Sequence, residues 1–568
     1  MSEMARGWAS AIFVIVGVMT ILALGPGCQR SPFDDKRFMR LEVDRDRVRE
    51  VDTLDLETRE RAREVDPEEV DIDAYARHLQ DPDDPLPLTI DACRAIALEH
   101  NLDLKVELVN PLIAAEQVSE EEARFEALFF SNINYANTDS PTSSTLSGSQ
   151  TESLSVEPGF ELPLRTGGSV SVSVPMNQFE TNNIFSTLNP AYATDLAISL
   201  SQPLLRNAGV RANTNAIRIA RYSSYAAQAR TKLQLIQVLT AVDRVYWRLY
   251  AARRELEVRK DEYDLAVAQR ERAQRRVNAG DAAEVEVIRA EAAVAERVEG
   301  IILAENAVRD RERDLKRIMN RPGLDLGSST IIVPSTEPTP VRYAVEARAL
   351  AEAALEQRME MLELQIQLAQ DDSQIAFARN QVLPLVDFTY SYNINGLGPT
   401  WNDSFDLLVD NRFEDHVFGL QVRIPLGNEA AESRFRQAVL QRLQRYATRE
   451  QRATAIRQEV FNAVDQLEAN WQRVLASRQA VLAAQRELSA EERQFELGLR
   501  VSTDVLDAQS RFANAQLAFI RAITEYEIAR VDIAFATGTV LGASRVQWAP
   551  APPEIEVDYG RAVREVIN

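Results

Sequence analysis

The sequence predicts an α+β protein that is internally duplicated and whose long coiled-coil helices are joined to β-strands. The first observation is a repeat, because Gly280 and residues 286–291 return as Gly498 and residues 504–509, 218 positions later. A repeat of this length indicates a duplicated half of the chain and not a short stacked unit. The second observation is an apolar period of seven residues, and the third is a set of segments that alternate apolar with polar residues.

Both repeats have the same predicted order: a helix, strands, a long helix, a turn and a second long helix. We expect the first repeat at 86–320, with an opening helix at 89–125, strands near 127–205 and long helices at 210–277 and 283–319. A linker at 321–340 leads to the second repeat at 341–541, with an opening helix at 341–381, strands near 384–426 and long helices at 429–495 and 502–537. A tail follows at 542–568.

The long helices carry apolar residues at every seventh place. In the second repeat these are Ala453, Val460, Leu467, Val474, Val481, Leu488 and Phe495. The first repeat has the same series from Val242 to Val277, interrupted at Arg270. A sustained period of seven imposes left-handed supercoiling on neighbouring helices. Helices of roughly 70 residues reach about 100 Å, so they form a rod or the wall of a tube.

The predicted strands alternate apolar with small or polar residues, as at 194–201, 386–392 and 418–424. This period of two, with aromatic residues on one face, suits a transmembrane β-barrel with lipid outside and water inside. A half-buried sheet in a soluble protein has the same period. We favour the barrel because Asp387 and Arg423 lie on the polar face and because the N-terminus predicts export.

The N-terminal residues have the pattern of a signal peptide at 1–27, with Arg6 before a short apolar run. The residues around Cys28 resemble a lipoprotein signal, so Cys28 is a candidate for lipidation. Ordinary cleavage of the signal peptide is the alternative. Residues 28–85 mix acidic residues with arginine and contain few large apolar side chains, which predicts a solvated extension.

Composition and motifs argue against two classes of protein. The chain has 64 basic and 86 acidic residues and a net charge of −22, which argues against nucleic acid as a partner. Its three histidines, His78, His100 and His416, are isolated, and the sequence contains no phosphate-binding glycine loop or nucleophile elbow. We therefore expect no catalytic residues, no cofactor and no metal site, and we predict that the protein is not an enzyme.

One turn motif is specific enough to indicate a family. Residues 495–508 read Phe-Glu-Leu-Gly-Leu-Arg-Val-Ser-Thr-Asp-Val-Leu-Asp-Ala, between two helices with the seven-residue period. With the duplicated order and the opening segment 88–101, this motif resembles the TolC family of outer-membrane efflux and secretion ducts. The resemblance covers residues 86–541. It implies a homotrimer in which each copy adds four strands to a twelve-stranded β-barrel and its long helices to an α-helical barrel.

The first repeat departs from this pattern by an insert between its strands. The insert includes the alternating run at 169–174. It either lengthens a hairpin outside the barrel or adds strands to it, and the sequence leaves both possibilities open.

The resemblance also implies a function, a location and partners. The protein would be the outer-membrane channel of a tripartite efflux or type I secretion system, extending into the periplasm. Its partners would be outer-membrane lipid, a periplasmic adaptor, and an inner-membrane pump or secretion ATPase. The turns at Gly280 and Gly498, with Leu499, would be the tips that dock the adaptor. The alternative function is a lipid-anchored periplasmic coiled-coil protein with a structural or tethering role.

Four charged residues near the turns are candidates for a gate. The resemblance places Arg500 at the family's linking arginine, Glu286 at its acidic partner, and Asp504 and Asp507 at two acidic ring positions. An arginine can pair with a carboxylate on the adjacent coiled coil, and three copies of the two aspartates would form a ring that favours cations. The family's linking tyrosine is replaced by Phe495, so one hydrogen bond of the closed state should be missing. Solvated charges at a helix end are the alternative.

Overall fold

The computed structural model describes residues 85–143, 148–280 and 282–548. The predicted signal peptide (1–27), Cys28 and all but the last residue of the predicted extension (28–85) therefore lie outside the described residues. The same holds for most of the predicted tail at 542–568, of which the structure describes the part up to residue 548.

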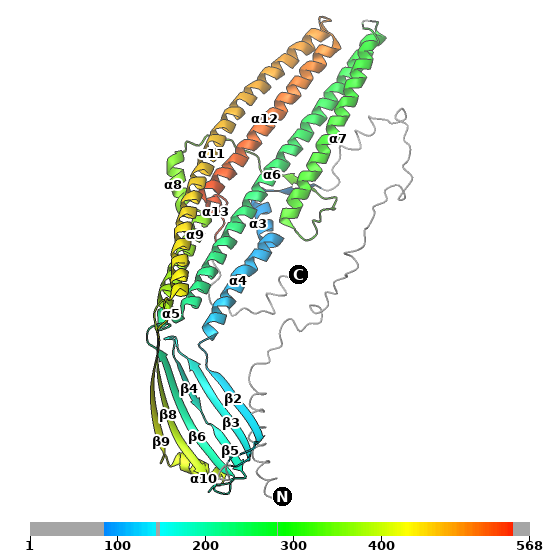
Figure 1. The fold of residues 1–568 in the computed structure, drawn as a ribbon. Helices are drawn as coiled ribbons and strands as arrows, with labels where there is room; N and C mark the ends of the chain where they lie inside the picture. Colours follow the sequence, from blue (N-terminus) through cyan, green and yellow to red (C-terminus); the bar gives the residue numbers. More distant parts are fainter. Residues whose placement is uncertain (1–84, 144–147, 281, 549–568) are drawn as a thin grey trace. The chain divides into compact units, whose positions relative to one another are not determined.

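Four long helices form two antiparallel hairpins. They are α6 (Asn215–Asn278) with α7 (Val285–Met319), and α11 (Glu429–Glu496) with α12 (Ser502–Thr537). The helices lie side by side in the order α11, α12, α6, α7 (Figure 1). The seven-residue series is buried between paired helices, as shown by Val294 and Ile301 of α7, which pack against Tyr263 of α6. The predicted combination of long paired helices with a sheet is confirmed.

The opening segment of each repeat is two helices, and the prediction of one continuous helix was wrong. The helices are α3 (Ile90–His100) and α4 (Leu102–Ala123) in the first repeat, and α8 (Ala347–Gln357) and α9 (Met359–Gln381) in the second. They are separated at Asn101 and Arg358, whose backbone is extended, with ψ of 126° and 134°. Both residues are buried and 257 positions apart, so the break is a duplicated feature.

Polar contacts explain why the chain breaks at these two residues. The Asn101 side chain accepts a hydrogen bond from the Leu104 backbone N–H at 2.8 Å and donates one to the Ile318 carbonyl at 2.8 Å. The Arg358 guanidinium pairs with Glu360 and Glu459. Each side chain therefore stabilises a non-helical backbone. Neither Gly nor Pro stands at these two places, so the usual sequence signals of a helix break are missing.

The segment predicted as a linker at 321–340 is packed and contains a strand. This strand, β7 (Ile331–Pro334), pairs in parallel with β1 (Pro85–Leu88). The Tyr246 hydroxyl of α6 donates to the Leu88 carbonyl at 3.1 Å and accepts from the Thr336 N–H at 2.9 Å. Ile332 is fully buried in the main apolar core, which also contains side chains of α3, α6 and α7. These contacts attach both ends of the first repeat to α6.

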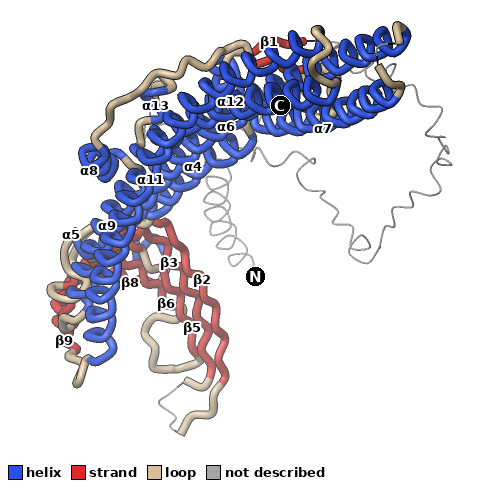
Figure 2. The backbone as a smooth tube through the Cα atoms, turned by 90° about the horizontal axis from the view of Figure 1, so that it is seen from above, coloured by secondary structure: helices blue, strands red, loops and turns tan. Residues whose placement is uncertain are grey.

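A seven-stranded antiparallel sheet lies beyond one end of the helices (Figure 2). Its strands are β2 (Leu128–Asp139), β3 (Gln150–Pro163), β4 (Ser169–Ser173), β5 (Met176–Thr181), β6 (Ala191–Pro203), β8 (Leu385–Gly398) and β9 (Glu414–Arg423). The order is β2-β3-β4-β6-β8-β9, and β5 pairs with β3 and β6. Strands of the two repeats therefore form one sheet, joined where β6 pairs with β8.

Strands β4 and β5 occupy a single position in this sheet. Both pair with β3 and β6, and the register runs on unchanged from Ser173, opposite Gly159, to Met176, opposite Val156. The ladder is interrupted because Pro158 and Pro175, which lie at this point, have no backbone N–H. The sheet thus has six strand positions in the described chain. The prediction of four strands per copy was wrong, because the insert adds two positions to the sheet.

The two faces of the sheet differ in polarity. Residues that pair across strands share a face, and successive residues of one strand alternate between faces. One face carries two rows of mainly apolar residues: Phe129, Phe160, Val172, Ile198, Tyr392 and His416, and Leu162, Val170, Leu200, Tyr390 and Phe418. The opposite face carries a row of mainly polar residues: Leu128, Glu161, Ser171, Ser199, Ser391 and Val417.

Three short helices complete the described structure: α5 (Val210–Asn213), α10 (Trp401–Val409) and α13 (Val540–Ala543). Helix α5 is separated from α6 at Thr214, so the helix predicted at 210–277 is interrupted near its start. Among the described helices, none carries an apolar stretch of the length that a bilayer requires.

Candidate gate at the hairpin tips

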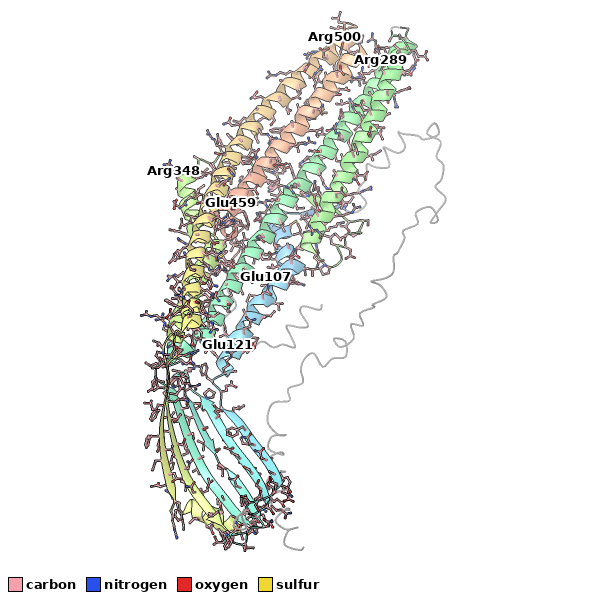
Figure 3. All side chains as sticks on the ribbon, viewed as in Figure 1. Glu107, Glu121, Arg289, Arg348, Glu459 and Arg500 are labelled. Carbon is pink, nitrogen blue, oxygen red and sulfur yellow. The ribbon has the colours of Figure 1, made fainter. Side chains whose placement is uncertain are left out.

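Each long hairpin ends in a turn that contains a glycine. Gly280 and Gly498 have φ of 81° and 76°, a conformation that side chains with a Cβ rarely adopt. No atom lies within 4 Å of the position of an added Cβ at either residue. Both glycines are therefore required by the backbone conformation of the turn and not by close packing around it. Figure 3 shows Arg500 and Arg289 at these tips, at the ends of the hairpins farthest from the sheet.

Arg500 pairs with residues of its own hairpin. Its Nε lies 3.0 Å from Gln494 Oε1 and 3.3 Å from Glu491 Oε2, and its Nη1 lies 3.8 Å from Asp504 Oδ2. The predicted contact between Arg500 and Glu286 is not among the contacts of the described chain. The Arg500 side chain is 47% exposed, so these ion pairs are solvated and individually weak.

Glu286 instead joins the two hairpins through the start of α12. Its Oε2 accepts a hydrogen bond from the Ser502 backbone N–H at 3.2 Å. The first N–H groups of a helix have no partner within the helix, and a carboxylate there also interacts favourably with the helix dipole. Glu286 therefore caps α12 from the other hairpin.

A second contact between the hairpins lies beside this cap. The Gln269 Nε2 of α6 donates to the Ser502 Oγ at 3.0 Å, and both side chains are almost fully buried. A buried polar pair is stabilising only while both partners remain hydrogen-bonded. Gln269, Ser502 and Glu286 together form what we call the tip latch.

Phe495 has a partner that the sequence did not reveal. The guanidinium carbon of Arg276, near the end of α6, lies 4.8 Å from the centroid of the Phe495 ring. A cation at this distance from an aromatic face is attracted to it. The contact joins the two hairpins at the position where the family resemblance implies a tyrosine hydrogen bond.

Asp504 and Asp507 lie in the first turns of α12, and Asp507 is exposed. Asp504 accepts a hydrogen bond from the Val501 N–H at 3.4 Å and thereby contributes to the turn. The neighbouring turn exposes apolar side chains, since Leu497, Leu499 and Val501 are 74%, 72% and 50% exposed. The second tip thus combines acidic residues with an uncovered apolar group. In the described residues, no cluster of three or more His, Cys, Asp or Glu side chains could hold a metal ion.

Comparisons with known proteins agree with this architecture. Residues 350–539 match a sequence family described as outer membrane efflux protein. A search of curated protein sequences finds no match to the chain.

Solved structures extend the likeness beyond the segment that matches the efflux family. CmeC, an outer membrane channel of Campylobacter jejuni, is 16% identical with a TM-score of 0.58, covering 79% of this chain and 85% of that one. VceC, an outer membrane protein of Vibrio cholerae, is 16% identical with a TM-score of 0.57, covering 82% and 96%. CusC is 13% identical with a TM-score of 0.59, covering 79% and 92%. The predicted resemblance to the TolC family is confirmed, and at this level of identity the solved structures establish the fold.

Proposed function

We propose that the protein is the outer-membrane channel of an efflux or secretion system and that three copies form it. The observation that carries this proposal is the two-faced sheet. One face is mainly apolar and the other mainly polar, as expected for a wall between lipid and water. In the described chain, β2 and β9 each pair on one side only, so further copies have to supply the missing neighbours.

The outer helices of the two hairpins support a closed ring of copies. Exposed apolar side chains follow directly after residues of the seven-residue series, namely Phe461, Leu475 and Leu482 on α11 and Ile288 and Ile302 on α7. Helices α11 and α7 lie at opposite ends of the row of helices. We propose that each stripe contacts the other stripe of a neighbouring copy in a ring. Packing one stripe against the other would bury apolar surface as in a coiled coil.

We propose the remaining assignments from the sequence and its family resemblance. The sheet would lie in the outer membrane and the hairpins would extend into the periplasm, with Cys28 as a lipid anchor. The tips at Gly280 and Gly498, with exposed Leu499, would dock a periplasmic adaptor, which connects to an inner-membrane pump or secretion ATPase. A coiled-coil tether would need neither the two-faced sheet nor its unpaired edges, so we favour the channel. We also expect no enzymatic activity.

Reconstitution of the purified full chain in planar bilayers tests the proposal. We expect trimers in detergent and ion currents across the bilayer. A monomer that remains in solution without detergent, gives no current and binds lipid only through its N-terminus would favour the tether.

We further propose that the tips gate the channel. Arg500, Asp504 and Asp507 from three copies would surround the axis, and the tip latch with Glu286 would hold the two hairpins of each copy together. Replacing Asp504 and Asp507 by Asn should lower the preference for cations, because the ring would lose its negative charge. Arg500→Ala with Asp504→Ala should raise the single-channel conductance by removing paired charges from the constriction. Unchanged conductance and unchanged cation preference would reject the gate.

A further inference from the structure

The insert of the first repeat, between β2 and β6, supplies strands β3, β4 and β5, and these three strands are built into the sheet. Strand β3 pairs with β2 at twelve positions, from Leu128 opposite Glu161 to Asp139 opposite Gln150. Its other edge pairs with β4 and β5, which in turn pair with β6. The insert therefore separates β2, which follows α4, from β6, which precedes α5.

The turn of this hairpin is anchored at the helical end of the sheet. The Thr166 carbonyl accepts a hydrogen bond from the Gly209 N–H at 2.9 Å, just before α5. The Thr166 hydroxyl lies 2.8 Å from Gln202 Oε1 of β6, and the Gln202 amide donates back to the Thr166 carbonyl at 3.2 Å. A hairpin that lay outside the sheet would not make these contacts with β6 and with the residue before α5.

The insert also continues the two faces of the sheet. On the apolar face Val172 lies between Phe160 and Ile198, and on the polar face Ser171 lies between Glu161 and Ser199. The alternation of the added strands is thus in phase with that of β6, β8 and β9. Strands that are exposed to water on both sides would not require this phase.

The helical part of the chain has no matching addition. Each repeat has one pair of long helices, whereas the first repeat supplies four strand positions and the second supplies two. Three copies of six positions make eighteen, against the twelve that four strands per copy would make. The diameter of a closed sheet grows roughly linearly with strand number, so the sheet would be about one and a half times as wide.

We propose that β3, β4 and β5 form part of the channel wall and widen its outer section, so that the sheet admits solutes larger than a twelve-position sheet would admit. This inference rests on the proposed trimeric channel. It places the size limit for cargo in the helical section and at the tips, since closed sheets of about eighteen strands leave a water-filled channel.

Two neighbouring cysteine variants test whether the insert lies in the wall. In trimers reconstituted in vesicles, Ser171→Cys should react with a water-soluble, membrane-impermeant maleimide at least about ten times faster than Val172→Cys. An apolar maleimide that partitions into the bilayer should show the reverse preference. The parental chain is the control, and its Cys93 should stay unlabelled because the thiol is fully buried and burial, together with the neighbouring Asp243 carboxylate, raises its pKa to about 12. Equal and rapid labelling of both variants by the water-soluble reagent would place the hairpin outside the wall and overturn the proposal.

A deletion tests the widening itself. Removing residues 140–190 joins the end of β2 directly to the start of β6 and leaves four strand positions per copy. In planar bilayers with polyethylene glycols added on the outer side, the full chain should admit polymers of about one and a half times the radius admitted by the deletion variant. Equal polymer limits would contradict the widening, whereas a full chain without current would contradict the proposed function as well. If the deletion variant does not fold, labelling of Ser171→Cys and Val172→Cys still decides whether the insert lies in the wall.

Discussion

Asp243 and Phe461 occupy equivalent places in the duplicated helices, 218 residues apart, but their surroundings are opposite. Asp243 on α6 is buried and accepts two hydrogen bonds from the Arg94 guanidinium, at 2.7 and 2.8 Å. Phe461 on α11 is an aromatic residue that remains 38% exposed. The carboxylate lies inside and the aromatic ring outside, which is the reverse of the usual preference.

The difference lies in what covers each helix. Helix α6 packs against α7 and α12 and is also covered by α3, α4 and α9, whereas α11 packs against α12, α8 and α9. As a result α6 buries more than twice as many side chains as α11, although the two helices are similar in length. The exposed ring of Phe461 therefore provides a test of the contact between copies proposed above.

The largest effect should come from a charge at Phe461. Phe461→Asp leaves the fold of a single copy intact, because this side chain is already partly exposed, but it places an unpaired carboxylate in the proposed contact between copies. A buried unpaired charge is strongly destabilising, so we expect loss of the trimer. Native mass spectrometry in detergent measures the outcome, with Ala480→Asp as the matched control on another exposed face of α11. A stable Phe461→Asp trimer would show that this stripe is not the interface.

The next largest effect should come from Asp243→Ala. This change leaves the Arg94 guanidinium largely buried without its main acceptor, and we expect a loss of about 3–5 kcal/mol in the free energy of unfolding. Denaturant unfolding of the full chain in detergent measures it. The double variant Arg94→Met with Asp243→Leu should recover most of the loss, since an apolar pair can replace a buried ion pair. Equal losses in the single and double variants would contradict this explanation.

A smaller effect is expected at the tip latch. Glu286→Ala removes the acceptor for the Ser502 N–H, and loss of a helix cap typically costs about 1 kcal/mol. Hydrogen exchange of the amides at the start of α12 should accelerate by about fivefold, while the sheet should not change. The control is Glu291→Ala, at an exposed position of α7, the helix that also carries Glu286. The latch has no role in holding α12 if both variants exchange at the same rate.

The smallest effect concerns pH and Glu360, at the start of α9. Burial alone would raise the pKa of the Glu360 carboxyl, but the hydrogen bonds from Arg358 and Arg452 outweigh it and hold the pKa below its ordinary value. The charged form is therefore favoured in the folded state. Its contribution is present above the ordinary pKa, near 4.5, and is lost as the pH falls through the lower folded pKa.

Glu360→Gln should accordingly flatten the dependence of the free energy of unfolding on pH below about pH 4.5. Asp243 should behave in the opposite way, because burial raises its pKa despite the contact with Arg94. Unfolding curves recorded from pH 7 to pH 3 measure the effect at Glu360, with exposed Glu356→Gln as the control. An identical pH dependence in Glu360→Gln and Glu356→Gln would contradict the assignment.

The long helices could be predicted because a strict period of seven is a local pattern that survives in any surroundings. The breaks at Asn101 and Arg358 could not, because they depend on partners such as Ile318 and Glu459 that are distant in sequence. The same reason explains why Gln269 was missed, since its partner Ser502 lies 233 positions away. The insert was recognised as alternating, but an alternating hairpin has the same pattern inside a sheet or beside it. Only the pairing of the inserted strands with β2 and β6 shows that the hairpin lies inside the sheet.

The two edge strands also constrain the order of events in biogenesis. In the described chain, β2 and β9 each present a row of backbone groups without a strand partner on one side, and both are long enough to template pairing with another chain. A newly made copy held in water would therefore tend to aggregate through these edges, whereas the helical hairpins bury their own core. The helices can therefore fold before the copies assemble, whereas the sheet can close only when the copies assemble. If three copies close the sheet as proposed, we expect these strands to be shielded until the copies meet.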